Sequence, residues 1–437
     1  MLRLDLPRLC REVAGHDPFE VSGRLRGATG VLTCSLPAAI GDQVAIRGKG
    51  RPVRAEVIGF ADGLAYLVPF DHTADLEPGM QVVHCGPGMT VPVGDALLGR
   101  VVDGLCRPID GRGPLAGCDR RPLLRGAPPP MDRARIRQPF VTGQRAIDGL
   151  LTLGRGQRVG IFAGSGVGKS TLLGEIAKGA ESDRNVIALV GERGREVAPF
   201  LEDCLGPAGL ARSVVVVATS DQTPLMRLRA AETAVTLADY YRRQGLNVLF
   251  MLDSLTRLAM ARRELGLGLG EPPTARGYTP SVFQMLANTV ERLGNAGRGS
   301  VTGILTVLVD GGDLDEPISD AARGLLDGHL VLDRRLANRG RFPAIHIAQS
   351  LSRVAGDVTT PEHRQAARKV KAALATYGEM EDLIRVGAYA RGSAPAVDRA
   401  LELLPAIEAF LCQEVGERTS FDDTRAALEK LAAAWTF

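Results

Sequence analysis

One run of residues carries the clearest chemical signature in the chain: Gly164-Ser165-Gly166-Val167-Gly168-Lys169-Ser170-Thr171. Its glycines let backbone N–H groups point inward around a phosphate, and the helix expected after them adds its positive N-terminal end. Lys169 can then reach the β- and γ-phosphates of a nucleotide, while the Ser170 hydroxyl is placed to bind Mg²⁺ and Thr171 supports the first helical turn. The run predicts a phosphate-binding loop for ATP and Mg²⁺, although Ala163 stands where the strict pattern has its first glycine.

Two acidic residues follow apolar runs that have the composition of buried strands. Glu192 comes shortly after residues 186–190, and Asp253 comes directly after residues 248–252. Nucleotide hydrolysis requires a carboxylate that orients and polarises the attacking water, and Glu192 is the best-placed candidate. Asp253 is expected to hold the water shell of Mg²⁺. The sequence therefore predicts a site that hydrolyses its nucleotide.

Each of these residues also has an ordinary structural interpretation. Asp253 could cap the helix that follows it. Glu192 could belong to a solvated charge cluster with Arg193, Arg195 and Glu196. A glycine-rich turn between a strand and a helix could explain the loop, but it would leave the adjacent lysine and serine unexplained. The catalytic and metal-binding interpretations are favoured.

The elements that must position these residues alternate along the middle of the chain. Apolar runs at residues 158–163, 186–190, 213–218 and 248–252 are separated by segments of helical length, among them 172–178. Strands that are apolar on both faces and alternate with helices are typical of a parallel sheet in an α/β fold. The carboxyl ends of such strands share one edge, where the loop and the two acids would meet.

The flanking regions predict two further domains. Short β-rich runs such as 53–60 and 65–70, separated by Gly, Pro and Asp turns, indicate a small N-terminal β-barrel. Residues 91–150 are rich in Gly, Pro and Arg and are interpreted as a connection into the core. Beyond residue 358 the pattern becomes helical, as in 363–374 and 405–413. The expected domains are 1–90, 91–357 and 358–437.

Composition excludes several classes of protein. The chain has 437 residues, and 53 Lys and Arg against 50 Asp and Glu give a formal charge of +3, which is no polyelectrolyte signature. Seven scattered cysteines show neither a disulfide framework nor a zinc pattern, which favours a reducing cytoplasm. No apolar run approaches the ~20 residues of a membrane helix. We expect a soluble intracellular protein.

The segment Pro343-Ala344-Ile345-His346-Ile347-Ala348-Gln349-Ser350-Leu351-Ser352 resembles a signature of the rotary-type ATPases, which include ATP synthase α and β subunits and type III export ATPases. The resemblance extends over nearly the whole chain and implies a RecA-like core. It also implies that Glu192 is the catalytic glutamate and that Arg193 contacts the γ-phosphate. Phe342 would pack on adenine, although a core position is equally compatible with its residue type.

Arg353, directly after that segment, matches the arginine that reaches the γ-phosphate of the neighbouring subunit in this family. A fixed guanidinium would stabilise charge that develops on the transferred phosphoryl group. By itself Arg353 would pass for a surface arginine. The resemblance thus implies that each site is completed by an adjacent chain.

Within the family, residues 95–104, 270–283 and 382–393 resemble the flagellar export branch, with the injectisome branch as the alternative. This branch implies a homohexamer that promotes unfolding, release and export of protein substrates at the cytoplasmic face of the inner membrane. Its implied partners are an export regulator, a stalk protein, export-gate proteins and chaperone–substrate complexes. Residues 1–13 would meet the regulator and associate peripherally with the membrane.

Two functions from other classes compete with this interpretation. A nucleic-acid-translocating ring would carry stacking aromatics beside basic residues on its barrel. Only Phe19 lies near such a pair, Arg24 and Arg26, so no nucleic-acid partner is expected. A non-hydrolysing structural ring subunit would lack the catalytic carboxylate, yet Glu192 is present.

Overall fold

The computed structural model describes residues 20–29, 31–48, 50–71, 75–123, 126–309 and 313–437. The N-terminal segment 1–13, expected to meet a regulator and the membrane, and Phe19 lie outside this part. The chain divides into two compact units, Met1–Thr90 and Val91–Phe437. No helix among the described residues is both long and apolar enough to cross a membrane.

The first unit is a closed β-barrel with strand order β1-β2-β5-β4-β3-β6, and the small β-barrel predicted from the short β-rich runs is confirmed. All neighbouring strands pair antiparallel. Inward side chains such as Leu25, Ile46 and Leu67 fill its interior, because successive residues of a strand face opposite sides. The strands are β1 Ser22–Thr29, β2 Val31–Cys34, β3 Gln43–Arg47, β4 Val53–Ala61, β5 Leu64–Pro69 and β6 Gln81–Gly86.

The second unit is built on a sheet with strand order β19-β18-β12-β17-β15-β13-β14-β8. The strands from β18 to β8 run parallel, whereas β19 pairs antiparallel with β18 and β16 antiparallel with β17. Its strands are β8 Val101–Asp103, β12 Arg158–Ala163, β13 Arg184–Val190, β14 Ser213–Ala218, β15 Asn247–Asp253, β16 Gly294–Ala296, β17 Gly299–Leu308, β18 Gly328–Leu332 and β19 Leu351–Ser352. The predicted parallel α/β core is confirmed.

The connecting segments are mostly helices that bury the faces of this sheet. They include α2 Arg145–Leu150, α3 Lys169–Gly179, α4 Gly194–Pro199, α5 Gly206–Ala211, α6 Pro224–Arg243, α7 Leu255–Gly268, α8 Pro280–Glu291, α9 Pro317–Leu325, α10 Arg334–Asn338 and α11 Ala355–Val358. The segment 91–150 is more than a connection, because β8 pairs with β14 and extends the sheet. It also holds the short strands β7 Thr90–Val93, β9 Asp119–Pro122 and, with β11 Leu153–Gly154, β10 Pro139–Phe140.

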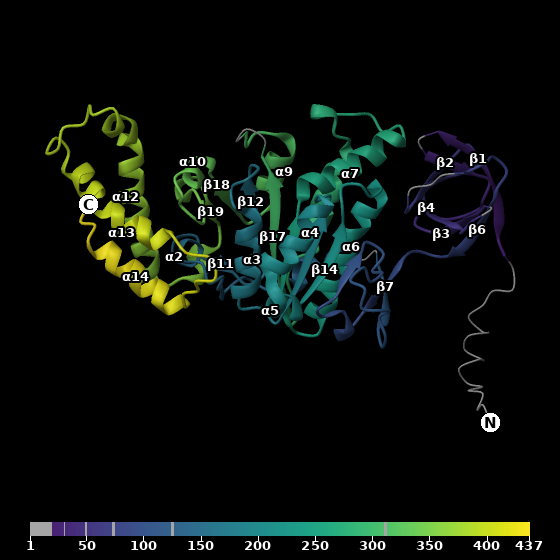
Figure 1. Cartoon of the computed structure of the whole chain (residues 1–437), viewed down its shortest axis with the longest axis horizontal. Coiled ribbons are helices and arrows are strands. Elements are labelled where there is room, and N and C mark those ends of the chain that lie inside the picture. The colour runs from purple at the N-terminus through teal and green to yellow at the C-terminus, as the bar shows by residue number, and fades with distance from the viewer. Residues whose placement is uncertain (1–19, 30, 49, 72–74, 124–125, 310–312) are drawn as a thin grey trace, which may run out of the picture. The chain divides into compact units, whose positions relative to one another are not determined.

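The C-terminal region is helical, as predicted, and its helices are longer than the segments 363–374 and 405–413 that the sequence indicates. They are α12 Pro361–Arg385, α13 Pro395–Leu411 and α14 Phe421–Ala433. Figure 1 shows them grouped beside α2, and residues of α13 and α14 share a hydrophobic core with α2 and the sheet.

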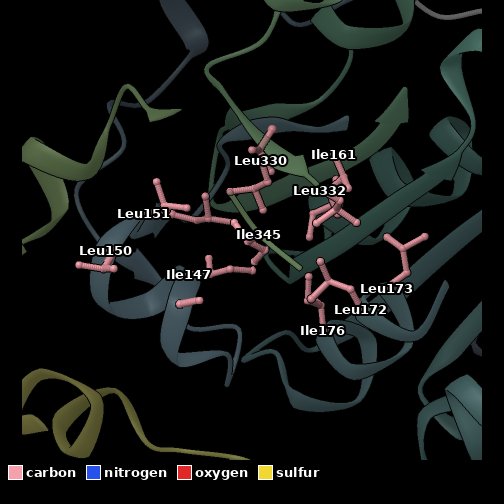
Figure 2. Close-up of a cluster of buried hydrophobic side chains, with 14 of the residues drawn as sticks. Ile147, Leu150, Leu151, Ile161, Leu172, Leu173, Ile176, Leu330, Leu332 and Ile345 are labelled. Atoms are coloured by element: carbon pink, nitrogen blue, oxygen red, sulfur yellow. The ribbon is translucent and has the colours of Figure 1, made fainter. Parts of the chain in front are cut away.

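That core fixes the helix that follows the phosphate-binding loop. Figure 2 shows Leu172, Leu173 and Ile176 of α3 among the side chains of this cluster, which also contains Ile161 of β12 and Leu332 of β18. All of them are buried. The packing of α3 against the sheet therefore holds its first residue, Lys169, in place.

Candidate active site

The glycine-rich run forms the loop between β12 and α3, as its pattern predicts. Gly166 and Gly168 have φ angles of +75° and +84°, a region that side chains with a Cβ rarely adopt. Val167 between them is buried in the core and anchors the loop. The helix begins at Lys169, earlier than the predicted 172, so Ser170 is an exposed residue of its first turn.

Three charged side chains meet at the carboxyl edge of the sheet. The ammonium Nζ of Lys169 lies 2.5 Å from Oδ1 of Asp253 and 3.4 Å from Oε1 of Glu192. Asp253 ends β15 and Glu192 follows β13, the neighbouring strand in the sheet. Thr306 of β17 donates its hydroxyl proton to Oδ1 of Asp253 at 2.6 Å. The structure thus brings together the predicted lysine and both predicted acids.

Electrostatics at this cluster set Glu192 apart from an ordinary surface acid. Burial, followed by the negative charge of Asp253, raises the pKa of Glu192 to about 7. The positive charges of Lys169 and Arg257 act in the opposite direction, with Nη2 of Arg257 lying 3.4 Å from Oε2 of Glu192. A carboxyl group with a pKa near neutrality can exchange a proton during a reaction at physiological pH. The alternative that Glu192 is merely part of a solvated cluster is wrong, because its side chain is buried.

Asp253 is not the helix cap that its position also suggested. Ser254 is the N-cap of α7, and its side chain accepts a hydrogen bond from the backbone N–H of Arg257 at 3.3 Å. The Asp253 carboxylate instead points to Lys169 and Thr306. With the exposed Ser170 hydroxyl it supplies oxygen donors of the kind that Mg²⁺ prefers, so the residues present fit that ion.

Arg193 and Arg353 lie away from this cluster. The Arg193 side chain is 62% exposed and forms its ion pair with Glu196 at 3.5 Å. Arg353 is exposed, and its Nη2 donates to the carbonyl oxygen of Arg323 at 3.1 Å. It follows β19, which pairs with the beginning of β18, so it lies at the amino edge of the parallel sheet. A strand such as β12, with its 6 residues, separates that edge from the phosphate-binding loop by about 20 Å.

Phe342 lies where an aromatic ring could meet a nucleotide base. The residue is 44% exposed, and a Cβ added to Gly168 would come within 3.2 Å of its ring. A cavity of about 340 Å³ opens there, beside the phosphate-binding loop. The lining residues are Gln144, Gly168, Thr171, Leu172, Glu175, Gly340, Phe342, Pro343, Cys412, Gln413, Glu414 and Val415.

Several residues around the site carry no local sequence signal. Thr306 lies within a long apolar strand, and Arg257 is one arginine among many. Residues 412–415 belong to the C-terminal region, more than two hundred positions from the loop that they approach. Only the folded chain brings these segments next to the phosphate-binding loop.

The fold and the site together define a P-loop ATPase with a RecA-like core. Three family models match the chain in order along its length. The ATP synthase alpha/beta family beta-barrel domain matches residues 32–86, and the nucleotide-binding domain of the same family matches 143–352. The C-terminal domain of the type III secretion ATPase EscN matches residues 359–430. The chain belongs to the ATP synthase alpha/beta family.

Relatives named for the flagellum and for type III secretion match most of the chain. The flagellum-specific ATP synthase of Bacillus subtilis is 49% identical over 420 residues, covering 95% of this chain and 96% of its own. The type 3 secretion system ATPase of Xanthomonas euvesicatoria is also 49% identical, over 85% of this chain and 84% of its own. The assembled ATPase EscN of enteropathogenic E. coli superposes with a TM-score of 0.89 and 45% identity over 94% of this chain and all of its own.

Proposed function

We propose that this chain is the MgATP-hydrolysing motor of a flagellar type III protein export apparatus, acting in the cytoplasm at the inner membrane. The observation that supports hydrolysis most directly is the convergence of Lys169, Glu192 and Asp253 beside the phosphate-binding loop. A protein that only binds nucleotide would have no use for a buried glutamate with a pKa near neutrality at that position.

The proposed roles follow from the positions of these groups. Backbone N–H groups of residues 164–168 and the start of α3 hold the phosphates, and Lys169 binds the β- and γ-phosphate oxygens. Glu192 orients the attacking water and accepts its proton. Ser170 and Asp253 would hold Mg²⁺, directly or through water, and the ion would neutralise charge that develops on the phosphates.

The remaining predicted residues would act at the ends of the nucleotide. Phe342 is proposed to stack on the adenine ring within the cavity that it lines. Arg193, which is exposed near Glu192, would turn toward the γ-phosphate when nucleotide is present. Arg353 is proposed to serve a neighbouring chain, since it lies at the other edge of its own sheet.

A ring is the assembly that these positions favour. A solved relative is described as the assembled EscN ATPase, and another as that ATPase in complex with its central stalk EscO. By extension, this chain is proposed to form a homohexamer, with the barrel holding the ring together. A stalk protein, the export regulator, gate proteins and chaperone–substrate complexes are its proposed partners.

The injectisome is the second candidate, because relatives of both systems match at 49% identity. Deletion of the gene in its source organism separates the two functions. A flagellar motor predicts loss of filaments and motility, restored by the wild-type gene but not by a Lys169→Ala variant. Loss of effector secretion with intact motility would identify the injectisome instead.

Hydrolysis itself is tested by release of phosphate from MgATP by the purified chain. Lys169→Ala should reduce turnover by at least about 100-fold, since the loss removes the cation that neutralises the transferred phosphate. Lys430→Ala, at an exposed position near the end of α14, is the matched control and should retain full turnover. Equal turnover of wild type and Lys169→Ala would reject this site.

A further inference from the structure

The connection between α13 and α14 forms one wall of the cavity beside Phe342. Cys412, Gln413, Glu414 and Val415 line it, opposite the phosphate-binding loop. This connection belongs to the C-terminal helical region, whereas the remainder of the cavity belongs to the α/β core. Whatever holds the connection in place therefore also sets the shape of the cavity.

Gln413 holds the connection, together with Arg145, which donates to the carbonyl oxygen of Cys412, and Glu175, which accepts from the backbone N–H of Gly416. Gln413 is 8% exposed, and its Nε2 donates to the carbonyl oxygens of Gly143 at 2.7 Å and Glu417 at 2.8 Å. Oε1 accepts a hydrogen bond from the backbone N–H of Arg145 at 2.9 Å. The backbone N–H of Gln413 donates to the carbonyl oxygen of Phe342 at 2.8 Å. One residue thus joins the segment before α2, the α13–α14 connection and the aromatic residue of the cavity.

Phe342 lies at the edge of the cavity, where it is partly exposed and its ring lies beside Gly168. Because the backbone N–H of Gln413 donates to the carbonyl oxygen of Phe342, the position of the connection is coupled to that of Phe342. The Gln413 side chain fixes this part of the connection through its hydrogen bonds with Gly143, Glu417 and Arg145. Loss of that side chain would loosen the connection at Gln413, and with it the position of Phe342.

We propose that Gln413 is a positioning residue for the nucleotide, which holds Phe342 and the α13–α14 connection in the geometry that receives the base. The inference rests on the proposed function, because it takes the cavity as the site of an adenine ring. Gln413 touches none of the groups proposed to act on the phosphates. Its replacement should weaken binding of nucleotide and leave the chemical step nearly intact.

The test measures binding and turnover separately. The probe is the fluorescent N-methylanthraniloyl derivative of ADP, titrated with Mg²⁺ present, alongside steady-state hydrolysis of MgATP. Gln413→Ala should raise the Kd of the probe and the KM for MgATP by about ten-fold, which is the loss of affinity expected when one base stacks poorly on its aromatic ring. The kcat should change less than about three-fold. An unchanged Kd and KM would overturn the proposal.

Two further variants guard against a simple folding defect. Gln413→Glu keeps the shape of the side chain but cannot donate to the two carbonyl oxygens, so it should weaken binding in the same direction. The matched control is Asn185→Ala, which also removes a buried amide with side-chain hydrogen bonds, to Ala177 and Ser213, but at the amino edge of the sheet. Asn185→Ala should leave the Kd unchanged. Wild-type affinity in Gln413→Glu would refute the role of the amide.

A double-mutant cycle shows whether Gln413 acts through Phe342. In a Phe342→Ala background no ring remains to be positioned, so adding Gln413→Ala should change the Kd by less than about two-fold. Additive effects would show that Gln413 acts by another route and would refute the proposal. Failure of the proposed function would give a different result, because the wild-type protein itself would then not hydrolyse ATP.

Discussion

Lys169 is a single cation facing two carboxylates, those of Asp253 and Glu192, in a largely buried cluster. Two neighbouring acids in such a place repel one another, and one of them holds its proton more tightly as a result. Asp253 has the closer lysine contact and accepts the Thr306 hydroxyl, whereas burial and the charge of Asp253 raise the pKa of Glu192 to about 7. Glu192 is therefore the residue that exchanges a proton near neutral pH.

The pH dependence of hydrolysis should report this proton. Below its pKa of about 7, Glu192 is protonated and cannot accept a proton from the attacking water; above it, the carboxylate is available. We expect kcat/KM for MgATP, measured in excess Mg²⁺, to rise with pH and level off above about 8, ten-fold beyond that pKa. Glu192→Gln should still bind nucleotide, lose at least about 100-fold in kcat and lose this rising limb, since an amide cannot accept the proton. A limb that persists in the variant would assign the titration to another group.

At the scale of single residues, the sequence predicts those functional residues that are identified by the residues next to them in the chain. Lys169 and Ser170 are identified by the loop around them, and Glu192 and Asp253 by the strands that precede them. The contact of Thr306 with Asp253 has no signal in the local sequence. Its hydroxyl faces Asp253 only because β17 lies between β12 and β15 in the sheet.

Among the elements, the strands predicted from apolar runs have the most accurate bounds. Residues 158–163 and 213–218 coincide with β12 and β14, and the other two predicted runs lie inside β13 and β15. Helix ends are located less well, because α3 begins within the glycine-rich loop where propensity gives no signal. The strand β8 was missed since its 3 residues are too few to show a period.

The docking of α13 and α14 on α2 depends strongly on Arg145. Its guanidinium donates to the carbonyl oxygens of Phe410 and Cys412, to the Thr419 hydroxyl and to Glu417. The hydrogen bond from Arg145 lowers the pKa of Glu417, which indicates that the pair favours the ionised carboxylate. Backbone acceptors that are partly buried, such as the carbonyl oxygens of Phe410 and Cys412, are costly to leave without a partner.

Arg145→Ala should therefore loosen the C-terminal helices locally. We expect the free energy of their opening to fall by about 2 kcal/mol, which amounts to roughly 30-fold faster amide hydrogen exchange in α13 and α14. Exchange in α6, on the central sheet, should be unchanged. The control is Arg425→Ala on α14, whose ion pairs with Asp422 and Glu429 are exposed and contribute little. Equal exchange in the two variants would contradict a specific role for Arg145.

At the scale of the whole molecule, the features that sequence patterns do not reveal are those made by distant segments. The order β12-β17-β15-β13 places the loop and the two acids at one edge, yet no local pattern specifies that order. Likewise Arg145 and Gln413 are 268 positions apart and share a hydrogen bond. Such contacts arise from the packing of whole elements around a common core, which is why the cavity wall was not predicted.

The position of Arg353 leads to a prediction about assembly. An exposed arginine at the amino edge of the sheet lies about 20 Å from its own phosphate-binding loop, too far for any side chain to span. If it acts on nucleotide, it acts on that of a neighbouring chain. The proposed ring, in which one chain supplies the loop and the next supplies the arginine, provides such a neighbour. Arg353→Ala and Lys169→Ala should each be inactive alone.

Mixing the two inactive proteins distinguishes this arrangement from action within one chain. In mixed rings some interfaces combine the intact loop of an Arg353→Ala chain with the intact arginine of a Lys169→Ala chain, and turnover should return at those interfaces. The expected recovery in an equal mixture is at most about one quarter of wild type, since random neighbours pair correctly at that frequency in a closed ring. Arg298→Ala, an exposed arginine in the turn before β17, is the matched control and should be active alone. Absence of recovery at every mixing ratio, in rings shown to exchange subunits, would mean that Arg353 does not complete a neighbouring site.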